Sequence, residues 1–277
     1  MRCLAVVALL CACLALLACS SGPAPPQPGT PKYFWSAAKT AHHTGDYGVA
    51  NHNLDALMES KNEFNTRAEA WALALNTGIV HGLAELSDAY DAGVKANPEH
   101  PLALYRRASQ SRKLANDAAM RSVEVFRRFI QTQDPKVALA FEYPVSPLPP
   151  PDLDKTKKGT VISDAEAEAL QRTMMQRGVI YALSRLAGAP DQPAKVEEMF
   201  RAGDVQVARE KFLFGMAQLF TEQAQLYDRK HIADPRRAGM MLVHATNALQ
   251  NVPEDKQVKE LRDKIKRLQK DLPVNVT

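Results

Sequence analysis

Cysteine is missing from almost the whole of this sequence. The chain has 277 residues and four cysteines, all near its N-terminal end: Cys3, Cys11, Cys13 and Cys19. The rest of the chain therefore has no means of forming an internal disulfide and offers no cysteine nucleophile. A domain folded from it must depend on its hydrophobic core for stability.

Alternating runs of β-branched and polar residues, which indicate half-buried strands, are also nearly absent. Alanine, leucine, glutamine, glutamate, lysine and arginine dominate instead, and these residues favour helices. Apolar residues recur every three or four positions in the segments 71–94, 205–226 and 258–272. The sequence therefore predicts an all-α fold, in which Gly78 and Gly82 mark a place of close helix packing.

The patterns that mark catalytic and metal sites are missing as well. The seven histidines include no pair four residues apart with a glutamate between them, as a helical zinc site requires. No serine lies in a glycine–serine–glycine turn, and no glycine-rich loop is placed to hold a phosphate. His42, His43 and His52 are neighbours in sequence, and we interpret them as surface residues. We therefore predict no catalytic residue, no metal and no cofactor, and a protein that is not an enzyme.

The N-terminal segment has the pattern of an export signal. Met1 and Arg2 precede an apolar run of 16 residues, from Cys3 to Ala18, that contains no charged side chain. A positive start followed by a short apolar core is typical of a secretory signal peptide. The run is shorter than the ~20 residues that span a membrane, so we expect a cleaved leader at residues 1–18.

The end of this run, Leu16-Leu17-Ala18-Cys19, resembles the lipobox of bacterial lipoproteins. Leu17 departs from the family pattern, which has a small or hydroxyl residue at that position. The resemblance implies that Cys19 is lipidated, becomes the N-terminus after cleavage and anchors the protein in a membrane. Ser20 follows the cysteine where an aspartate would resemble an inner-membrane retention signal. We therefore expect a lipoprotein of the cell envelope, in the outer membrane and facing the periplasm.

A tether and two helical halves follow the leader. Five prolines between Ser20 and Pro31 predict an extended tether. Prolines 144, 147, 149, 150 and 151 with Gly159 predict a loop without helix that divides the fold. We expect these segments: a signal peptide (1–18), a lipidated N-terminus and tether (19–31), helical half 1 (32–141), a Pro-rich loop (142–162), helical half 2 (163–272) and a tail (273–277).

Helix boundaries can be located in the second half. Ser163 and Glu166 have the spacing of a capping box, which predicts a helix from this point through Leu186. Asp234-Pro235 and Val252-Pro253 each predict a helix start with proline in the first turn. The sequence alone does not determine whether the two halves pack as one body.

Two turns share a glycine–aspartate pair followed by a small and then an apolar residue. The residues concerned are Gly45, Asp46, Ala50 and Leu54 in the first half, and Gly203, Asp204, Ala208 and Phe212 in the second. This pattern resembles the tetratricopeptide repeat, a pair of antiparallel helices. Its period of ~34 residues is not sustained, however, and Leu57 and Gly215 stand where the repeat has its second alanine. The expected fold is therefore a set of helical hairpins, either tetratricopeptide-like or an irregular α-bundle.

Positive charge is concentrated between residues 106 and 128, where seven basic residues face only Asp117 and Glu124. These residues could attract an anionic lipid, polymer or protein, or they could simply form a solvated helix face. The candidate anionic-partner surface is Arg106, Arg107, Arg112, Lys113, Arg121, Arg127 and Arg128.

Methionine is concentrated in the second half, where it could fill the core or line an apolar pocket. The residues are Met174, Met175, Met199, Met216, Met240 and Met241.

Helical hairpins present extended surfaces that suit protein binding. The sequence therefore favours a scaffold or adaptor that binds an envelope protein, with the membrane as a second partner through the lipid. Export argues against nucleic acid as a partner. The alternative is a ligand-binding module for a small apolar molecule, associated with solute uptake.

Overall fold

The structure is a computed structural model that describes residues 25–99, 101–141, 152–203 and 205–272. Within these ranges the chain forms ten α-helices, one short 3-10 helix and a small two-stranded sheet, which confirms the all-α prediction. The predicted leader, Cys19, the first half of the tether and the tail at 273–277 lie outside the described residues.

The elements follow one another in this order: α2 (Pro31–His43), α3 (Tyr47–Met58), α4 (Asn65–Ala96), α5 (Pro101–Phe129), β1 (Lys136–Leu139), α6 (Leu153–Lys157), α7 (Asp164–Leu186), α8 (Pro193–Arg201), β2 (Val205–Ala208), α9 (Arg209–Ala224), the 3-10 helix η1 (Gln225–Tyr227), α10 (Pro235–Leu249) and α11 (Lys256–Lys270).

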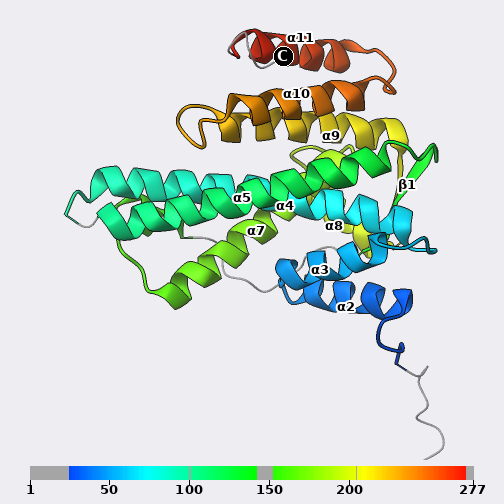
Figure 1. Ribbon diagram of the computed structural model, residues 1–277, viewed down its shortest axis with the longest axis horizontal. Coiled ribbons are helices and arrows are strands. Elements are labelled where there is room, and N and C mark those ends of the chain that lie inside the picture. The colour runs from blue at the N-terminus through cyan, green and yellow to red at the C-terminus, as the bar shows by residue number, and fades with distance from the viewer. Residues whose placement is uncertain (1–24, 100, 142–151, 204, 273–277) are drawn as a thin grey trace, which may run out of the picture.

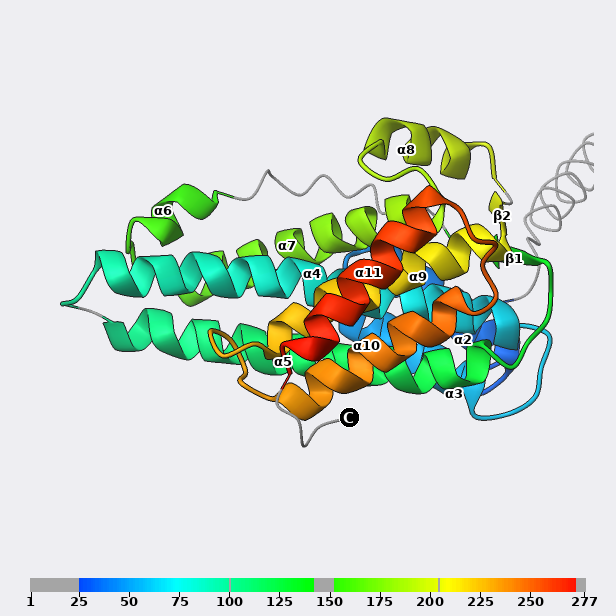
Figure 2. The same ribbon diagram turned by 90° about the horizontal axis from the view of Figure 1, so that it is seen from above.

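The helices are arranged in layers around the long pair α4 and α5 (Figure 1). The hairpin of α2 and α3 lies on one side of this pair, and α7 crosses it obliquely. On the other side, α9 and α10 form a second layer. The last helix, α11, lies across α9 and α10 on the outside of the molecule (Figure 2). The middle layer therefore separates the N-terminal hairpin from the C-terminal helices.

The two predicted halves pack together as one body. Helix α4 of the first half lies along α7 of the second, and β1 pairs with β2 across the same division. A single hydrophobic core contains Trp71 and Phe126 from the first half and Phe212 and Phe220 from the second. The two halves therefore share one core.

Local capping signals position several helices where the sequence predicts them. The Ser163 hydroxyl accepts a hydrogen bond from the backbone N–H of Glu166, whose carboxylate accepts one from Ser163 in return, and α7 ends at Leu186 as expected. Asp234 caps α10, with Pro235 in its first turn. The predicted start of α11 at Val252-Pro253 is wrong, because the helix begins at Lys256. There the Asp255 carboxylate accepts a hydrogen bond from the Val258 N–H at 2.8 Å.

The first of the two similar turns forms a helical hairpin, and the second does not. In the first, Gly45 has a φ of +76°, and Asp46 then caps α3 through the N–H of Val49. In the second, the residues after the turn form strand β2, which runs antiparallel to β1 with Val205 opposite Leu139. The helical interpretation of 203–208 is therefore wrong, and Asp204 itself lies outside the described residues. Residues 205–208 form a strand because they pair with β1, which is distant in sequence.

The expectation of a loop without helix between the halves is also wrong in part. Residues 142–151 lie outside the described residues, but Leu153–Lys157 form the short helix α6. Leu153 and Thr156 of this helix are buried, and a Cβ on Gly93 would lie 2.3 Å from the Thr156 carbonyl oxygen. Contact with α4 thus holds this helix in place.

Glycines allow α4 and α7 to cross with their backbones in contact. A Cβ on Gly82 would lie 2.0 Å from the carbonyl oxygen of Met174, and one on Gly78 would lie 2.4 Å from the Cα of Val179. On the opposite helix, a Cβ on Gly178 would lie 2.0 Å from the Gly78 carbonyl oxygen. Any other residue at these positions would force the helices apart. The predicted close packing at Gly78 and Gly82 is confirmed.

We expect the substitution Gly82→Ala to lower the free energy of unfolding by about 3 kcal/mol or more, because its methyl group meets backbone rather than a movable side chain. Gly48→Ala in α3 is the matched control. There the added Cβ meets only a carboxylate oxygen of Asp46, at 3.6 Å, so this variant should be unchanged or up to ~1 kcal/mol more stable. Urea unfolding followed by circular dichroism measures both. Equal stability of the two variants would contradict the close crossing.

Candidate functional site

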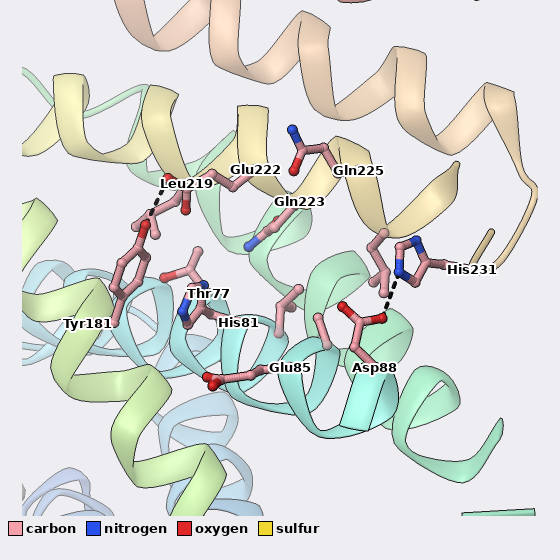
Figure 3. A pocket seen from close by; sticks show the side chains of 13 residues that line it. Thr77, His81, Glu85, Asp88, Tyr181, Leu219, Glu222, Gln223, Gln225 and His231 are labelled. Carbon is pink, nitrogen blue, oxygen red and sulfur yellow. Dashed lines mark hydrogen bonds and ion pairs between the residues drawn. The ribbon is translucent and has the colours of Figure 1, made fainter. Parts of the chain in front are cut away.

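A pocket of about 400 Å³ opens between α4, α7, α9 and the segment that follows α9 (Figure 3). We call it the His81 pocket. Its wall on α4 spans three turns, and single residues come from α7 and from the loop before α10. The lining residues are Thr77, Val80, His81, Ala84, Glu85, Asp88, Tyr181, Leu219, Glu222, Gln223, Gln225, Leu226 and His231.

The glycine crossing places two aromatic rings of this pocket face to face. The rings of His81 on α4 and Tyr181 on α7 are stacked, with centroids 3.7 Å apart and planes 6° from parallel. Burial lowers the pKa of His81 to about 4, with further contributions from the nearby Arg177 and Arg185. The imidazole is therefore uncharged at neutral pH and offers one donor and one acceptor nitrogen.

A polar network continues from Tyr181 toward α9. The Tyr181 hydroxyl donates to a carboxylate oxygen of Glu222 at 2.8 Å and accepts from Arg185 at 2.9 Å. Arg185 also lies 3.8 Å from that carboxylate and 4.9 Å above the centre of the tyrosine ring. Burial raises the pKa of Glu222, and burial together with Glu222 raises the pKa of Tyr181 to about 12. This network orients Tyr181, and its hydroxyl proton is held in the hydrogen bond to Glu222.

The opposite end of the pocket is closed by His231, which lies between two carboxylates. One ring nitrogen is 2.8 Å from Asp88 on α4, and the other is 2.7 Å from Asp228. Burial alone would lower the pKa of His231, but the hydrogen bonds and negative charges of the two aspartates outweigh it and raise that pKa. The contact ties the loop before α10 to α4.

The polar side chains of the pocket differ in whether their hydrogen-bonding groups are already paired. The Thr77 hydroxyl donates to the Leu73 carbonyl oxygen at 2.7 Å, so it is held within its own helix. Within the ranges that the structure describes, no three histidine, cysteine, aspartate or glutamate side chains are placed to hold a metal ion. What the pocket does offer is two unpaired buried atoms, Nε2 of Gln223 and Oε2 of Glu222, without a hydrogen-bond partner among the described residues.

A second, larger cavity of about 940 Å³ lies between the N-terminal hairpin and helices α4, α5 and α7. We call it the hairpin groove. Met120, Met175, Ile79 and Leu83 are among its apolar lining. Charged side chains of both signs also line it: Asp46, Asp117, Arg121, Glu124 and Arg172.

The candidate anionic-partner surface is not a single uncompensated patch. Four of its seven residues form ion pairs with carboxylates, most of them on other elements: Arg107 with Asp164 at 2.9 Å, Arg112 with Asp91, Lys113 with Asp117 at 3.2 Å, and Arg121 with Asp55 at 2.8 Å. Arg128 donates to the Met58 carbonyl oxygen at 3.4 Å. Arg106 and Arg127 are exposed and, in the described part of the chain, have no carboxylate within 4.0 Å. The charge mainly joins α5 to its neighbours.

The methionines of the second half mostly belong to the core. Met174, Met216 and Met241 are fully buried, and Met175, Met199 and Met240 pack against the core from its edge. None of the six lines the His81 pocket, and Met175 alone among them lines the hairpin groove. A methionine-lined pocket in the second half is therefore the wrong interpretation.

The three neighbouring histidines do not share one environment. His43 and His52 are exposed, but the expectation of a surface position is wrong for His42, which is 2% exposed and contacts Tyr47 and Trp71 edge-on. Burial, with His43 nearby, lowers the pKa of His42 to about 4. This residue belongs to the aromatic core beneath the hairpin.

The comparisons with known proteins found no relative from which a function of the site could be inferred. No family model matches the sequence, and neither a curated protein nor a solved structure shows significant similarity to it. No helix in the described ranges combines the length and apolar character needed to cross a membrane.

Sequence reasoning missed the His81 pocket because its residues come from segments far apart in the chain, from Thr77 on α4 to His231 before α10. His81 and Tyr181 carry no motif, and neither is near a recognisable turn. The sequence held one indirect signal, the glycines at 78 and 82, because the crossing at these glycines determines which side chains of α4 and α7 meet.

The two histidines of the pocket should titrate on opposite sides of their ordinary pKa of 6.5. We expect His81 to stay neutral until the pH approaches 4, and His231 to remain protonated above 6.5. His81 thus contributes stability that is present above pH 6.5 and lost as the pH falls toward 4. His231 contributes stability that is present below pH 6.5 and lost as the pH rises through its folded pKa.

Ring carbon–proton NMR shifts recorded from pH 3.5 to 9 measure both values. Asp88→Asn should lower the pKa of His231 without moving that of His81. A value near 6.5 for His81 would show that its ring is solvated and would contradict the stacked geometry.

Proposed function

We propose that this protein is a lipid-anchored lipoprotein of the cell envelope that acts as a scaffold, binding another envelope protein in the hairpin groove. The observation that carries the binding role is the groove itself, a cavity of about 940 Å³ whose lining combines apolar and charged side chains. Membrane attachment through Cys19 rests on the leader pattern and on the resemblance to the lipobox.

The shape and chemistry of the groove suit a segment of protein. Met120, Met175 and Leu114 are only partly buried, so their apolar surfaces are available to a partner. Charges of both signs around them can pair with a partner's charges and determine its orientation. An amphipathic helix presents such a combination, an apolar face flanked by polar residues. We therefore expect the partner to insert one helix between the α2–α3 hairpin and α5.

A second candidate function, the binding of a small molecule, is favoured by the His81 pocket. Its volume of about 400 Å³ lies within the ~300–1,000 Å³ range of ordinary ligand sites, and a buried amide lines it without a complete set of partners. The two functions use different cavities and do not compete for residues.

The anchor is tested with Cys19→Ala. The variant precursor should not incorporate radiolabelled palmitate and should leave the membrane fraction, because two or more acyl chains are needed for stable attachment. Ser20→Ala, next to the modified residue, is the matched control and should behave as the unmodified chain does. A Cys19→Ala protein that stays with salt-washed membranes would rule out the lipoprotein proposal.

The groove is tested by site-specific photocrosslinking in intact cells. A photoreactive residue at position 120, in the groove, should crosslink one envelope protein, and the same residue at position 243 should not. Val243 is a suitable control because it is 51% exposed and lies on α10, away from the groove.

Mass spectrometry identifies the crosslinked protein, which is then tagged and used in a pull-down. The tagged partner should bind the unmodified chain and its Val243→Glu variant, but it should not bind the Met175→Glu variant. A charge placed at position 175 stands in the apolar part of the groove and disfavours an apolar partner. Equal retention of both variants, or the same crosslinks from both positions, would exclude the groove as the binding surface.

A further inference from the structure

Gln223 is a buried residue of the His81 pocket whose hydrogen bonding is incomplete. Its side chain comes from α9, is 4% exposed, and lines the pocket floor. One amide atom lies 3.4 Å from the Ser122 hydroxyl, and the other, Nε2, is buried with no partner among the described residues. Figure 3 shows this end of the side chain directed toward Thr77 and His81. Buried polar atoms are rarely left unpaired, so this amide is placed to contact something in the pocket.

The amide can serve a ligand as donor or as acceptor. The Ser122 hydroxyl already donates to the Ala119 carbonyl oxygen at 2.7 Å, so its oxygen is free to accept. A half-turn of the Gln223 amide would let its NH₂ group donate to Ser122 and direct its carbonyl oxygen into the pocket. A ligand group that carries both a carbonyl oxygen and an N–H complements either orientation.

A second unpaired atom belongs to the preceding residue of α9, which also lines the pocket. Oε2 of Glu222 is buried and has no partner among the described residues, because Tyr181 and Arg185 both contact the other carboxylate oxygen. It can accept a hydrogen bond from a ligand N–H. The neutral His81 ring adds a further donor and acceptor, and no hydrogen bond joins it to the described residues.

The charges around the pocket disfavour an ionic ligand. Each lining carboxylate already has a basic side chain as its neighbour: Glu85 has Arg177 at 3.5 Å, Glu222 has Arg185 at 3.8 Å, and Asp88 has His231 at 2.8 Å. A ligand charge would therefore enter without a counterion of its own, at the cost of its hydration. The remaining walls are apolar and suit a flat hydrocarbon body: Val80, Ala84, Leu219 and Leu226.

We propose that the His81 pocket is a binding site for a small uncharged molecule that carries an amide group on a flat apolar body. The amide pairs with Gln223 and with Oε2 of Glu222, and the body lies against the apolar walls. This site is separate from the hairpin groove, and the proposal holds whether or not the protein is a scaffold.

Benzamide and benzoate are matched probes, since they share size and shape and differ in charge and in the N–H donor. Ligand-observed NMR titration of the full-length chain in detergent, with empty micelles as the blank, measures both. Benzamide should bind with a dissociation constant of about 1 mM or tighter, in keeping with its few atoms. Benzoate should bind at least about tenfold more weakly, because its charge finds no partner.

Gln223→Leu should weaken benzamide binding about tenfold, the loss expected for one hydrogen bond. This variant should still fold, since leucine removes an unpaired polar group from the interior. Gln218→Leu, the same change on the same helix outside the pocket, should bind benzamide normally. Benzamide binding that is absent, that is equalled by benzoate, or that survives Gln223→Leu unchanged would each overturn the proposal.

Discussion

The backbone contact between α4 and α7 is the constraint on which the rest of the structure depends. No disulfide holds the described helices together, and the N-terminal and C-terminal halves of the chain are joined mainly through this crossing and the short sheet. Gly78, Gly82 and Gly178 remove the side chains that would otherwise separate the helices. Helix α7 is held on its other side too, where a Cβ on Gly215 of α9 would lie 2.6 Å from the Arg185 carbonyl oxygen. Backbones in such contact pack at the density of a protein interior and have little room to shift.

The geometry of the candidate site follows from this crossing, which also buries polar groups at a cost in free energy. Bringing the helices together stacks His81 on Tyr181 and partly buries both rings, which disfavours the charged form of the histidine. The carboxylate of Glu222 is partly buried as well, and it is stabilised by the Tyr181 hydroxyl and by Arg185. Burying these groups would be unfavourable if they were isolated, so the polar network is a condition of the crossing as much as a result of it.

The parts of the fold that were predictable from sequence are those determined locally. The capping box at Ser163, the cap at Asp234 and the glycines of the crossing all act within a few residues or through a conspicuous residue type. Most of the errors fall where a contact distant in sequence determines the structure; the start of α11 is an exception, because the local cap at Asp255 sets it. Strand β2 exists because β1 lies beside it, and α6 exists because it packs on α4. In the same way, the basic residues of α5 looked like a surface from sequence alone, whereas Asp55, Asp91 and Asp164 pair with three of them. The pocket was not predicted for the same reason, because its lining residues are far apart in sequence.

The two cavities share helix α4 but use different faces of it. Asn76, Ile79 and Leu83 line the hairpin groove, while neighbouring positions on the same turns, Val80 and Ala84 among them, line the His81 pocket. Communication between the two sites would require an element with two arrangements that both occupants bias. The α4–α7 crossing does not supply one, because sliding either helix would drive the backbone at Gly78, Gly82 and Gly178 into its neighbour. The arrangement therefore favours two independent sites on a rigid support, with each occupant recognised by its own face of the same helix.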